Sequence, residues 1–267
     1  MSGHLRSVIK LIESSVNLTA DEKSLLLNKI KSVDEEILVY EREARLEISL
    51  EKVRDKTMTM LTSSDVAETV KLLFEEMVKL GVKMIRCGIG IMKEDMKMEI
   101  WTSNAEAREH AELLVGLFDM NMHRMFQLAR TSWENKNKVF SYDLHGDDLI
   151  AYYTAVNSMQ DYKTKYNLET VPKDLYHNSF HFNEGTLFVF SLEPLPEELK
   201  NICGRFAGVF GQTYRRFLDL KEAERQRTLV EEKHKETLDS INYAKRIQQS
   251  LLPTESYLAR VLKGEGD

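Results

Sequence analysis

Cysteine, proline and glycine are scarce in this chain, which holds two, four and twelve of them among 267 residues. Two cysteines are too few for a disulfide framework, and Cys87 and Cys203 both lie in apolar segments. We therefore expect two reduced core residues. Few prolines and 30% charged residues favour long, solvated helices over a loop-rich fold.

Long hydrophobic runs are also lacking. No apolar stretch approaches the roughly 20 residues that cross a bilayer, and the N-terminus MSGHLRSVIKLIESS has too short an apolar stretch for a signal peptide. A cytoplasmic location without a membrane partner is therefore expected. The net charge of −6 comes from interspersed acidic and basic residues, so no basic patch indicates nucleic acid binding.

Residues 1–61 predict an N-terminal helical segment. Thr19-Ala20-Asp21-Glu22 has the composition of a helix start, and no glycine or proline interrupts residues 32–61, which predicts one long helix there. A weak coiled-coil seam is indicated by apolar residues at 4-3 spacing, with Glu43 and Thr57 as polar interruptions. The apolar positions of this predicted seam are Val39, Leu46, Leu50, Val53 and Met60.

Residues 62–220 alternate between helical and strand patterns. A helix is predicted from residues 62–65 to Gly81, followed by a hairpin of residues 84–92 and 97–102. Residues 105–135 predict a helix, 139–144 a third strand, and the next twenty or so residues another helix. A second hairpin joins 176–182 to 186–192. The pattern predicts an α+β fold with an antiparallel sheet of about five to six strands and packed helices.

A last helix begins after Pro196 and meets no breaker before Leu252, so it extends over about 55 residues, or on the order of 80 Å. Its half beyond Ala223 must protrude from a domain of this size, which favours pairing with a second copy. Three glycines inside the helix each cost about 1 kcal/mol relative to alanine. We expect close approach of another helix, first of all the one ending near Leu61, at Gly204, Gly208 and Gly211.

Candidate binding residues lie on the predicted strands. His177 and His181 project to one face with Ser179 between them, and the lack of a third ligand favours a polar pocket rim over a metal site. Trp101 is either a stacking platform or a core residue. Arg86, Tyr142 and His181 converge on one cavity in this prediction, where the arginine would receive an anion. No catalytic residue and no metal ligand is predicted, because no nucleophile–base motif or phosphate loop occurs.

Two sets of segments resemble known families. SINYAKRIQQSLLP, residues 240–253, closely resembles the lead-in helix of SpoIIE-type metal-dependent serine/threonine phosphatases, but their catalytic domain does not follow it. LEKVRDKTMTML (50–61), SSDVAETVKLLFEEMVKLGV (63–82), RCGIGIM (86–92) and FAGVFGQTYRRFLDLKEAE (206–224) resemble GAF-like sensor domains of bacterial signalling proteins, notably of Bacteroidetes type. This second resemblance covers about residues 45–225.

The GAF resemblance implies a GAF/PAS-like sheet with ligand-facing loops and helices on one side and dimerising N- and C-terminal helices on the other. The Asn-Lys-Phe-Asp-Glu signature of cyclic-nucleotide-binding members is absent, and nothing matches the cysteine and Pro-His surroundings of bilin-binding members. The resemblance therefore names no cofactor, and any small-molecule ligand stays undetermined.

We expect a homodimeric sensor that is not itself an enzyme, with four parts. These are an N-terminal helical segment (1–61), a GAF-like sensor domain (62–220), a signalling helix or coiled coil (221–252) and a linker to a missing output domain (253–267). Input would pass along the last helix to a phosphatase domain. On its inner side we place Ile241, Ala244, Ile247 and Leu251.

Three alternatives stay open at this point. The chain would be the regulatory module of a histidine kinase or cyclase, a passive dimerisation scaffold, or a small-molecule enzyme with a dispersed active site.

Overall fold

The computed structural model of the chain describes residues 3–60, 63–104, 114–159 and 165–251, together with Tyr257 and Gly264. The chain forms two compact units, residues 1–215 and residues 216–267. The long helix α6 (Glu197–Leu251) contributes residues to both units. The two units are described separately below.

The first unit is built on a six-stranded sheet, in the order β3-β2-β1-β6-β5-β4. Every pair of neighbouring strands is antiparallel. This confirms the predicted α+β fold with an antiparallel sheet. The strands are β1 (Arg86–Met92), β2 (Lys97–Asn104), β3 (Leu114–Asp119), β4 (Val139–His145), β5 (Asp174–Phe182) and β6 (Gly185–Ser191).

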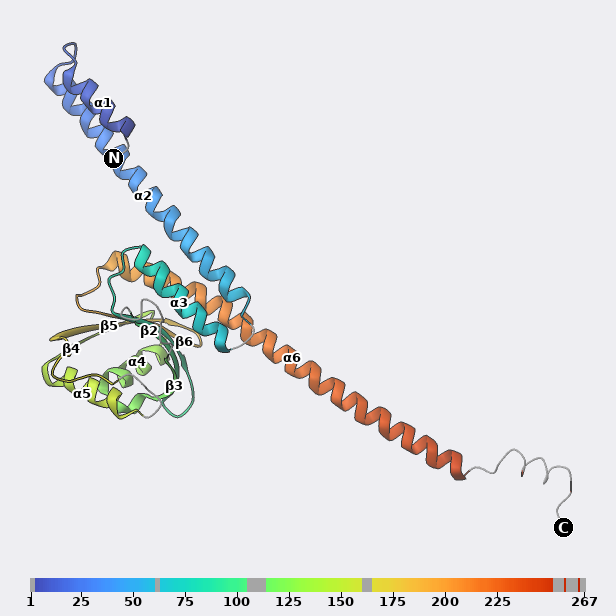
Figure 1. The fold of residues 1–267 in the computed structure, drawn as a ribbon. Helices are drawn as coiled ribbons and strands as arrows, with labels where there is room; N and C mark the ends of the chain where they lie inside the picture. The colour runs from blue at the N-terminus through green and yellow to red at the C-terminus, as the bar shows by residue number, and fades with distance from the viewer. Residues whose placement is uncertain are drawn as a thin grey trace. The chain divides into compact units, whose positions relative to one another are not determined.

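Helices cover both faces of this sheet (Figure 1). One face carries α3 (Ser63–Lys79) and the first part of α6, and the other carries α4 (Arg124–Glu134) and α5 (Gly146–Ser158). We call these the α6 face and the α5 face. Because successive residues of a strand point to opposite faces, Arg86 and Gly88 belong to the α5 face and Cys87 and Ile89 to the α6 face.

The core of the α5 face joins the sheet to α4, α5 and the short 3₁₀ helix η1 (Met120–Met122). Burial of apolar area at about 25 cal/mol per Å² is the main force that holds these helices on the strands. The buried members include aromatic rings and methionines from the strands and from the helices. Among them are Met98, Ile100, Phe118, Met120, Met125, Phe126, Leu144, Leu149, Tyr152, Leu175, Phe188 and Phe190.

The prediction of one helix over residues 105–135 is wrong for its middle part, and is confirmed only for α4 near its end. Residues 114–119 form the edge strand β3, and α4 begins only at Arg124. Leu114, Leu117 and Met120 have helical spacing, but Gly116 and Phe118 fit an alternating pattern equally well. Phe118 is buried while Leu117 is half exposed, as the strand requires. Residues 105–113 lie outside the described part of the chain.

The N-terminal segment contains α1 (Gly3–Ser14) and a 39-residue helix α2 (Ala20–Met58). The predicted helix start is confirmed, since Thr19 and Glu22 form a reciprocal capping box. The long helix is not limited to residues 32–61, because nothing interrupts it after Ala20. Similarly, the predicted extent of the last helix is confirmed, since α6 has 55 residues.

The coiled-coil seam predicted on α2 is wrong as a contact between copies. Leu46, Leu50, Val53 and Met60 are between 0 and 6% exposed within the subunit itself. They are buried where the second half of α2 and the residues just after it pack beside α3, inside the first unit. Side chains that are already buried this way are not available to a second copy. Val39, the first member of the predicted set, is exposed.

The expected helix contact is not found at Gly204 and Gly211 of α6. A Cβ on Gly211 would lie 2.6 Å from the Cβ of Phe182, and a Cβ on Gly204 would lie 3.9 Å from Cδ1 of Phe180. At these two glycines the neighbour is therefore strand β5, and not the helix ending near Leu61 that the sequence predicts. Among the described residues, a Cβ on Gly208 would meet nothing within 4 Å, so the space beside Gly208 is open and a helix contact there stays a prediction.

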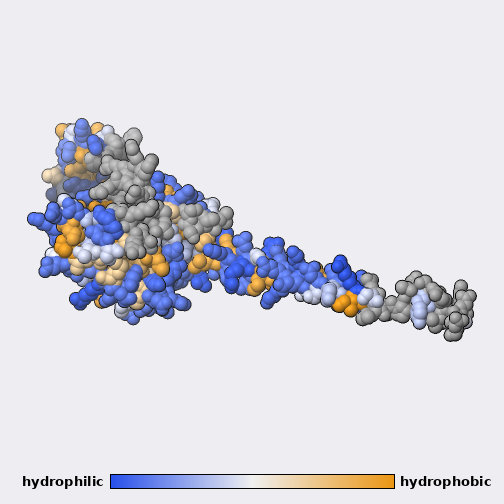
Figure 2. Space-filling view, turned by 60° about the horizontal axis from the view of Figure 1, so that its bottom comes forward, coloured by the Kyte–Doolittle hydropathy of each residue, from blue (hydrophilic) through white to orange (hydrophobic). Residues whose placement is uncertain are grey.

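The second unit contains the rest of α6. Every residue from Asp219 to Gln248 is exposed, including Ile241, Ala244 and Ile247. Figure 2 shows this stretch as mainly hydrophilic with scattered hydrophobic patches. The side chain of Leu251 and nearly all of the predicted linker 253–267 lie outside the described residues. Within the described residues, no helix combines the length and the apolar character that crossing a membrane requires.

Candidate ligand cavity

A small cavity lies on the α5 face, between the sheet and helices α4 and α5. Its volume is about 40 Å³, enough for water but not for a ligand of many atoms. Three of its walls are methionines, whose flexible side chains adapt to irregular space. The lining residues are Arg86, Met92, Met98, Ile100, Thr102, Phe118, Met120, Phe126, Ala129, Tyr152, Val156, His177, Ser179, Thr186, Phe188 and Phe190.

Arg86 supplies the positive charge of this cavity. It is only 7% exposed, and its guanidinium carbon lies 4.2 Å from the centre of the Phe190 ring. The guanidinium donates hydrogen bonds to the hydroxyls of Tyr152 and, at 3.1 Å, Tyr166. A desolvated cation on an aromatic face gains about 2 kcal/mol or more from the ring quadrupole. Strand β1 thus places a cation among aromatic side chains at the edge of the cavity.

His177 is the second polar group of the cavity and is 4% exposed. Its Nε2 lies 2.8 Å from Oγ of Ser179, and its ring centre lies 4.6 Å from that of Phe190. Within the described part of the chain, its Nδ1 has no hydrogen-bond partner. Burial, the charge of Arg86 and the nearby His181 lower the pKa of His177 to about 3. The imidazole is therefore neutral at pH 7 and can donate or accept one further hydrogen bond.

His181 shares the face of His177 but not its cavity. The two residues are four positions apart on β5, which separates them by about 13 Å. The Nε2 of His181 lies 3.3 Å from Oγ of Ser132 on α4, and burial lowers the pKa of His181 to about 4. His181 lines a separate hollow with Trp133 and Lys136. The predicted convergence of Arg86 and His181 on one cavity is therefore not found.

Tyr142 and Trp101 also lie outside the cavity. Tyr142 pairs with His177 in the β4–β5 register and is half-buried. Burial and a hydrogen bond with Asp148 raise the pKa of Tyr142. Trp101 is 2% exposed and points to the α6 face, because its neighbours Ile100 and Thr102 line the cavity. Ligand binding by the five candidate residues stays a prediction, and two of them, Arg86 and His177, line the cavity.

Sequence reasoning missed several walls of this cavity. Tyr152, whose hydroxyl accepts a hydrogen bond from Arg86, has helical spacing with other apolar residues, so its sequence position does not distinguish it from a core residue. Phe190 and Thr186 lie on a strand whose residues are all buried, so no alternation marks the side that faces the cavity. A sequence signal does exist at Gly88, where a Cβ would lie 2.5 Å from the Phe188 ring. The glycine makes room for an aromatic wall.

Metal binding and thiol chemistry find little support in the residues that the structure describes. They contain no group of three or more His, Cys, Asp or Glu side chains placed to hold a metal ion. Cys87 and Cys203 are both buried and free, as predicted. Burial raises the pKa of both thiols, to about 12 for Cys203, and a protonated thiol is a poor nucleophile.

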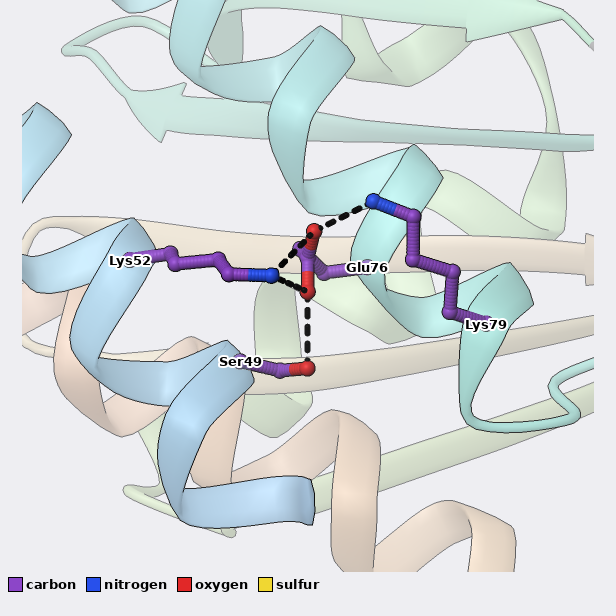
Figure 3. Close-up of polar contacts among 4 residues, drawn as sticks. All are labelled: Ser49, Lys52, Glu76 and Lys79. Atoms are coloured by element: carbon purple, nitrogen blue, oxygen red, sulfur yellow. Dashed lines mark hydrogen bonds and ion pairs between the residues drawn. The ribbon is translucent and has the colours of Figure 1, made fainter.

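A buried carboxylate joins α2 to α3. Glu76, 1% exposed, accepts a hydrogen bond from Oγ of Ser49 at 2.7 Å and forms ion pairs with Lys79 at 2.6 Å and Lys52 at 3.4 Å (Figure 3). Burial raises the pKa of Glu76, but the hydrogen bonds from Lys79 and Ser49 and the two positive charges outweigh it. The pKa of Glu76 therefore lies below its ordinary value.

Helix α2 is held on its other flank by α6. Arg205 donates to Glu43 at 2.6 Å and also bonds Glu47. Both glutamates are more than half exposed, so these contacts orient the helix more than they stabilise it. Together, the contacts of Glu76 and Arg205 fix which side of the second half of α2 faces α3 and which side faces α6.

No protein-family model matches the sequence, and no curated protein matches it either. The similar solved structures are GAF domains and phytochrome chromophore-binding domains. A GAF domain structure has 10% identity, a TM-score of 0.40, and coverage of 64% of this chain and 88% of its own. The GAF domain of an Acinetobacter phosphoenolpyruvate-protein phosphotransferase has 8% identity, a TM-score of 0.35, and coverage of 62% and 93%. The chromophore-binding domain of an R. palustris bacteriophytochrome has 14% identity, a TM-score of 0.41, and coverage of 70% and 63%.

Proposed function

We propose that this chain is a cytoplasmic, homodimeric sensor module of GAF type without catalytic activity of its own. One observation carries the proposal. A cation, a neutral imidazole and a hydroxyl, from Arg86, His177 and Ser179, line a mainly apolar cavity. A few convergent polar groups in an apolar enclosure are typical of small-molecule sites. The four sequence blocks that resemble GAF domains support the same assignment.

The ligand proposed is a small molecule with an apolar body and one polar group. At about 40 Å³ the cavity must enlarge to admit it. Met92, Met98 and Met120 are the walls that can rearrange at low cost, since methionine has three rotatable bonds and a polarisable sulfur. Binding would therefore move the inner surface of η1 and of strands β1 and β2.

The output proposed is mechanical. Helix α6 packs on the sheet through its first part, and from Asp219 to Gln248 it is exposed. A change in the sheet could pass along a continuous helix as a rotation or a change of register. We propose a SpoIIE-type phosphatase domain as the receiver, on the resemblance of residues 240–253. A test is to determine the coding DNA after codon 267. An in-frame or adjacent phosphatase would support this receiver, and a kinase or cyclase would replace it.

Thermal unfolding with added compounds tests the sensor proposal, because a ligand of the folded state raises Tm. We would screen amino acids, nucleotides, haem and metals against the full chain, Ala129→Leu and Leu128→Ala. Ala129 lines the cavity, whereas Leu128 is 38% exposed and serves as the control. A compound that stabilises the chain and Leu128→Ala but not Ala129→Leu supports the proposal. Equal stabilisation of all three proteins contradicts it.

One contact favours an enzyme as the second candidate. Ser179 and His177 lie 2.8 Å apart, which is the distance of a nucleophile and its base. However, a pKa of about 3 makes His177 a weak base at pH 7. Turnover of a screened compound that disappears in Ser179→Ala would favour the enzyme. Binding that survives Ser179→Ala without turnover would favour the sensor.

A further inference from the structure

Helix α2 carries a second row of apolar residues besides the one buried in its own subunit. The row consists of Leu26, Ile30, Val33, Ile37, Tyr40 and Ala44, and we call it the α2 stripe. Its steps of four and three residues alternate without a break, which is the spacing of a coiled-coil seam. At about 100° per residue, Ile37 lies about 180° around the helix from Leu46. The stripe therefore points away from the surface that packs on the first unit.

The stripe is largely exposed in the subunit. Val33 is 47% exposed, Ile37 41% and Tyr40 74%. Helix α1 packs beside the beginning of α2, where Leu5, Ile9 and Ile12 are half-buried and Ile30 is partly covered. From Lys31 to Arg45, every described residue except Asp34 is exposed. A helix in water with such a row has apolar area that a partner helix would bury.

The rotation of α2 prevents the first unit from covering the stripe. Ser49 and Lys52 bind Glu76 on one flank, and Glu43 and Glu47 bind Arg205 on the other. Turning the stripe inward would break both sets of contacts and expose Leu46, Leu50 and Val53. The stripe must therefore find its partner outside its own subunit.

The side chains of the stripe indicate which partner fits. In this heptad frame the a positions are Ile30, Ile37 and Ala44, and the d positions are Leu26, Val33 and Tyr40. In parallel coiled coils, β-branched residues at a together with Leu at d favour two strands, a pattern that Ile30, Ile37 and Leu26 follow. A matching row of the same period is always available on a second copy, and a twofold axis places identical rows together. Glu36 would face Glu41 of the second copy, which is repulsive, whereas Lys29 would face Asp34, which is attractive, so the apolar contact must supply most of the stabilisation.

We propose that the α2 stripe is the surface through which two copies of this chain associate, as a parallel two-stranded coiled coil. This inference specifies the homodimer of the proposed function and rests on it. This coiled coil would hold the first units of the two copies together about a common twofold axis. It would do so without any contribution from the distal part of α6. It also replaces the predicted seam, of which every member except Val39 is buried, by a row on the opposite side of the same helix.

Light scattering after size-exclusion chromatography tests this surface, with the full chain loaded at 10 to 200 µM. Ile37→Glu changes the stripe, and Leu38→Glu is its matched control, because Leu38 is 39% exposed and lies one position off the stripe. We expect a dimer for the unchanged chain and for Leu38→Glu, and a monomer with an unchanged Tm at low concentration for Ile37→Glu. The expected weakening of association is at least about 100-fold.

Two other outcomes separate the inference from the proposed function. If Ile37→Glu remains as dimeric as Leu38→Glu, the α2 stripe is not the interface, although the homodimer stands. If the unchanged chain is monomeric at 200 µM, the homodimer itself is wrong and the inference fails with it.

Disulfide trapping tests the orientation, because Cys87 and Cys203 are buried and do not compete. In a parallel pair, Ile37→Cys forms a disulfide with itself under mild oxidation, while Leu38→Cys does not. In an antiparallel pair centred between Val33 and Ile37, a mixture of Val33→Cys and Ile37→Cys links across the two proteins in preference to either alone. That result would overturn the parallel arrangement.

Discussion

Oγ of Ser49 donates a 2.7 Å hydrogen bond to the carboxylate of Glu76, and this contact joins the N-terminal helix α2 to α3. The carboxylate is 1% exposed, while the lysines that balance its charge are more than half exposed. Ser49 is therefore the buried partner in the cluster. It fixes where α2 lies, and with it the direction of the α2 stripe.

Ser49→Ala tests this contact. The variant leaves one oxygen of a buried carboxylate without its donor, and a hydrogen bond to a charged group is worth about 1.5–3 kcal/mol. We expect the free energy of unfolding to fall by about 2 kcal/mol in urea titrations. Ser32→Ala, on the exposed part of the same helix, should change it by less than about 0.5 kcal/mol. Equal effects of the two variants would show that Glu76 finds other donors.

The two glycines Gly208 and Gly211 should respond in opposite directions to alanine. Space beside Gly208 is open, so Gly208→Ala should raise the free energy of unfolding by about 1 kcal/mol through helix propensity. A Cβ on Gly211 would lie 2.6 Å from Phe182, and overpacking costs about 1–3 kcal/mol. Gly211→Ala should therefore be neutral or destabilising in thermal and urea unfolding. Destabilisation by Gly208→Ala would indicate that a second copy covers this site.

Long-range partners explain why sequence patterns succeeded for some elements and failed for others. The 55-residue length of α6 was predictable, because no breaker occurs and propensity acts locally. The strand at 114–119 was not, because Leu114, Leu117 and Met120 fit a helix until pairing with β2 is known. The same holds for α2, where two apolar rows lie on opposite sides. Sequence alone could not decide which one faces the subunit.

The cavity shows the same limit. Alternation on β5 predicted correctly that His177 shares a face with His181. It could not say that β1 lies next to β6 and not next to β5, so the distance between Arg86 and His181 was unknown. The strand order brings Phe190 beside Arg86 instead. Chemistry assembled by strand order is not visible in one sequence.

The free energy of unfolding should decrease as the pH is lowered, and His177 should account for part of this decrease. Its pKa in the folded chain, about 3, is below its ordinary value of 6.5. Between these two pKa values His177 is protonated in the unfolded chain but not in the folded chain. The free energy of unfolding therefore decreases as the pH falls from 6.5 toward 3. From pH 7 to pH 5 the loss due to this residue is about 2 kcal/mol at 1.36 kcal/mol per unit.

Urea titrations of the unchanged chain and His177→Gln at pH 7 and pH 5 measure that share. We expect the pH-dependent loss to shrink by about 2 kcal/mol in the variant, whatever its stability at pH 7. Glu76 does not interfere, because its carboxylate titrates below its ordinary value of 4.5. An unchanged pH dependence would mean that His177 takes up a proton in the folded chain.

The distal part of α6 should be the least protected regular structure in the chain when copies are separated. All residues from Asp219 to Gln248 are exposed, whereas Phe206 and Phe210 earlier in the same helix are fully buried. Amide exchange follows local opening, which is easiest where few apolar contacts hold a helix. In exchange measured by mass spectrometry at low micromolar concentration, residues 219–248 should exchange far faster than residues 203–211. If a second copy pairs with this stretch, its protection must rise with protein concentration. Strong protection that is independent of concentration would mean that the stretch folds back on its own subunit, and signal transfer along a free helix would then be excluded.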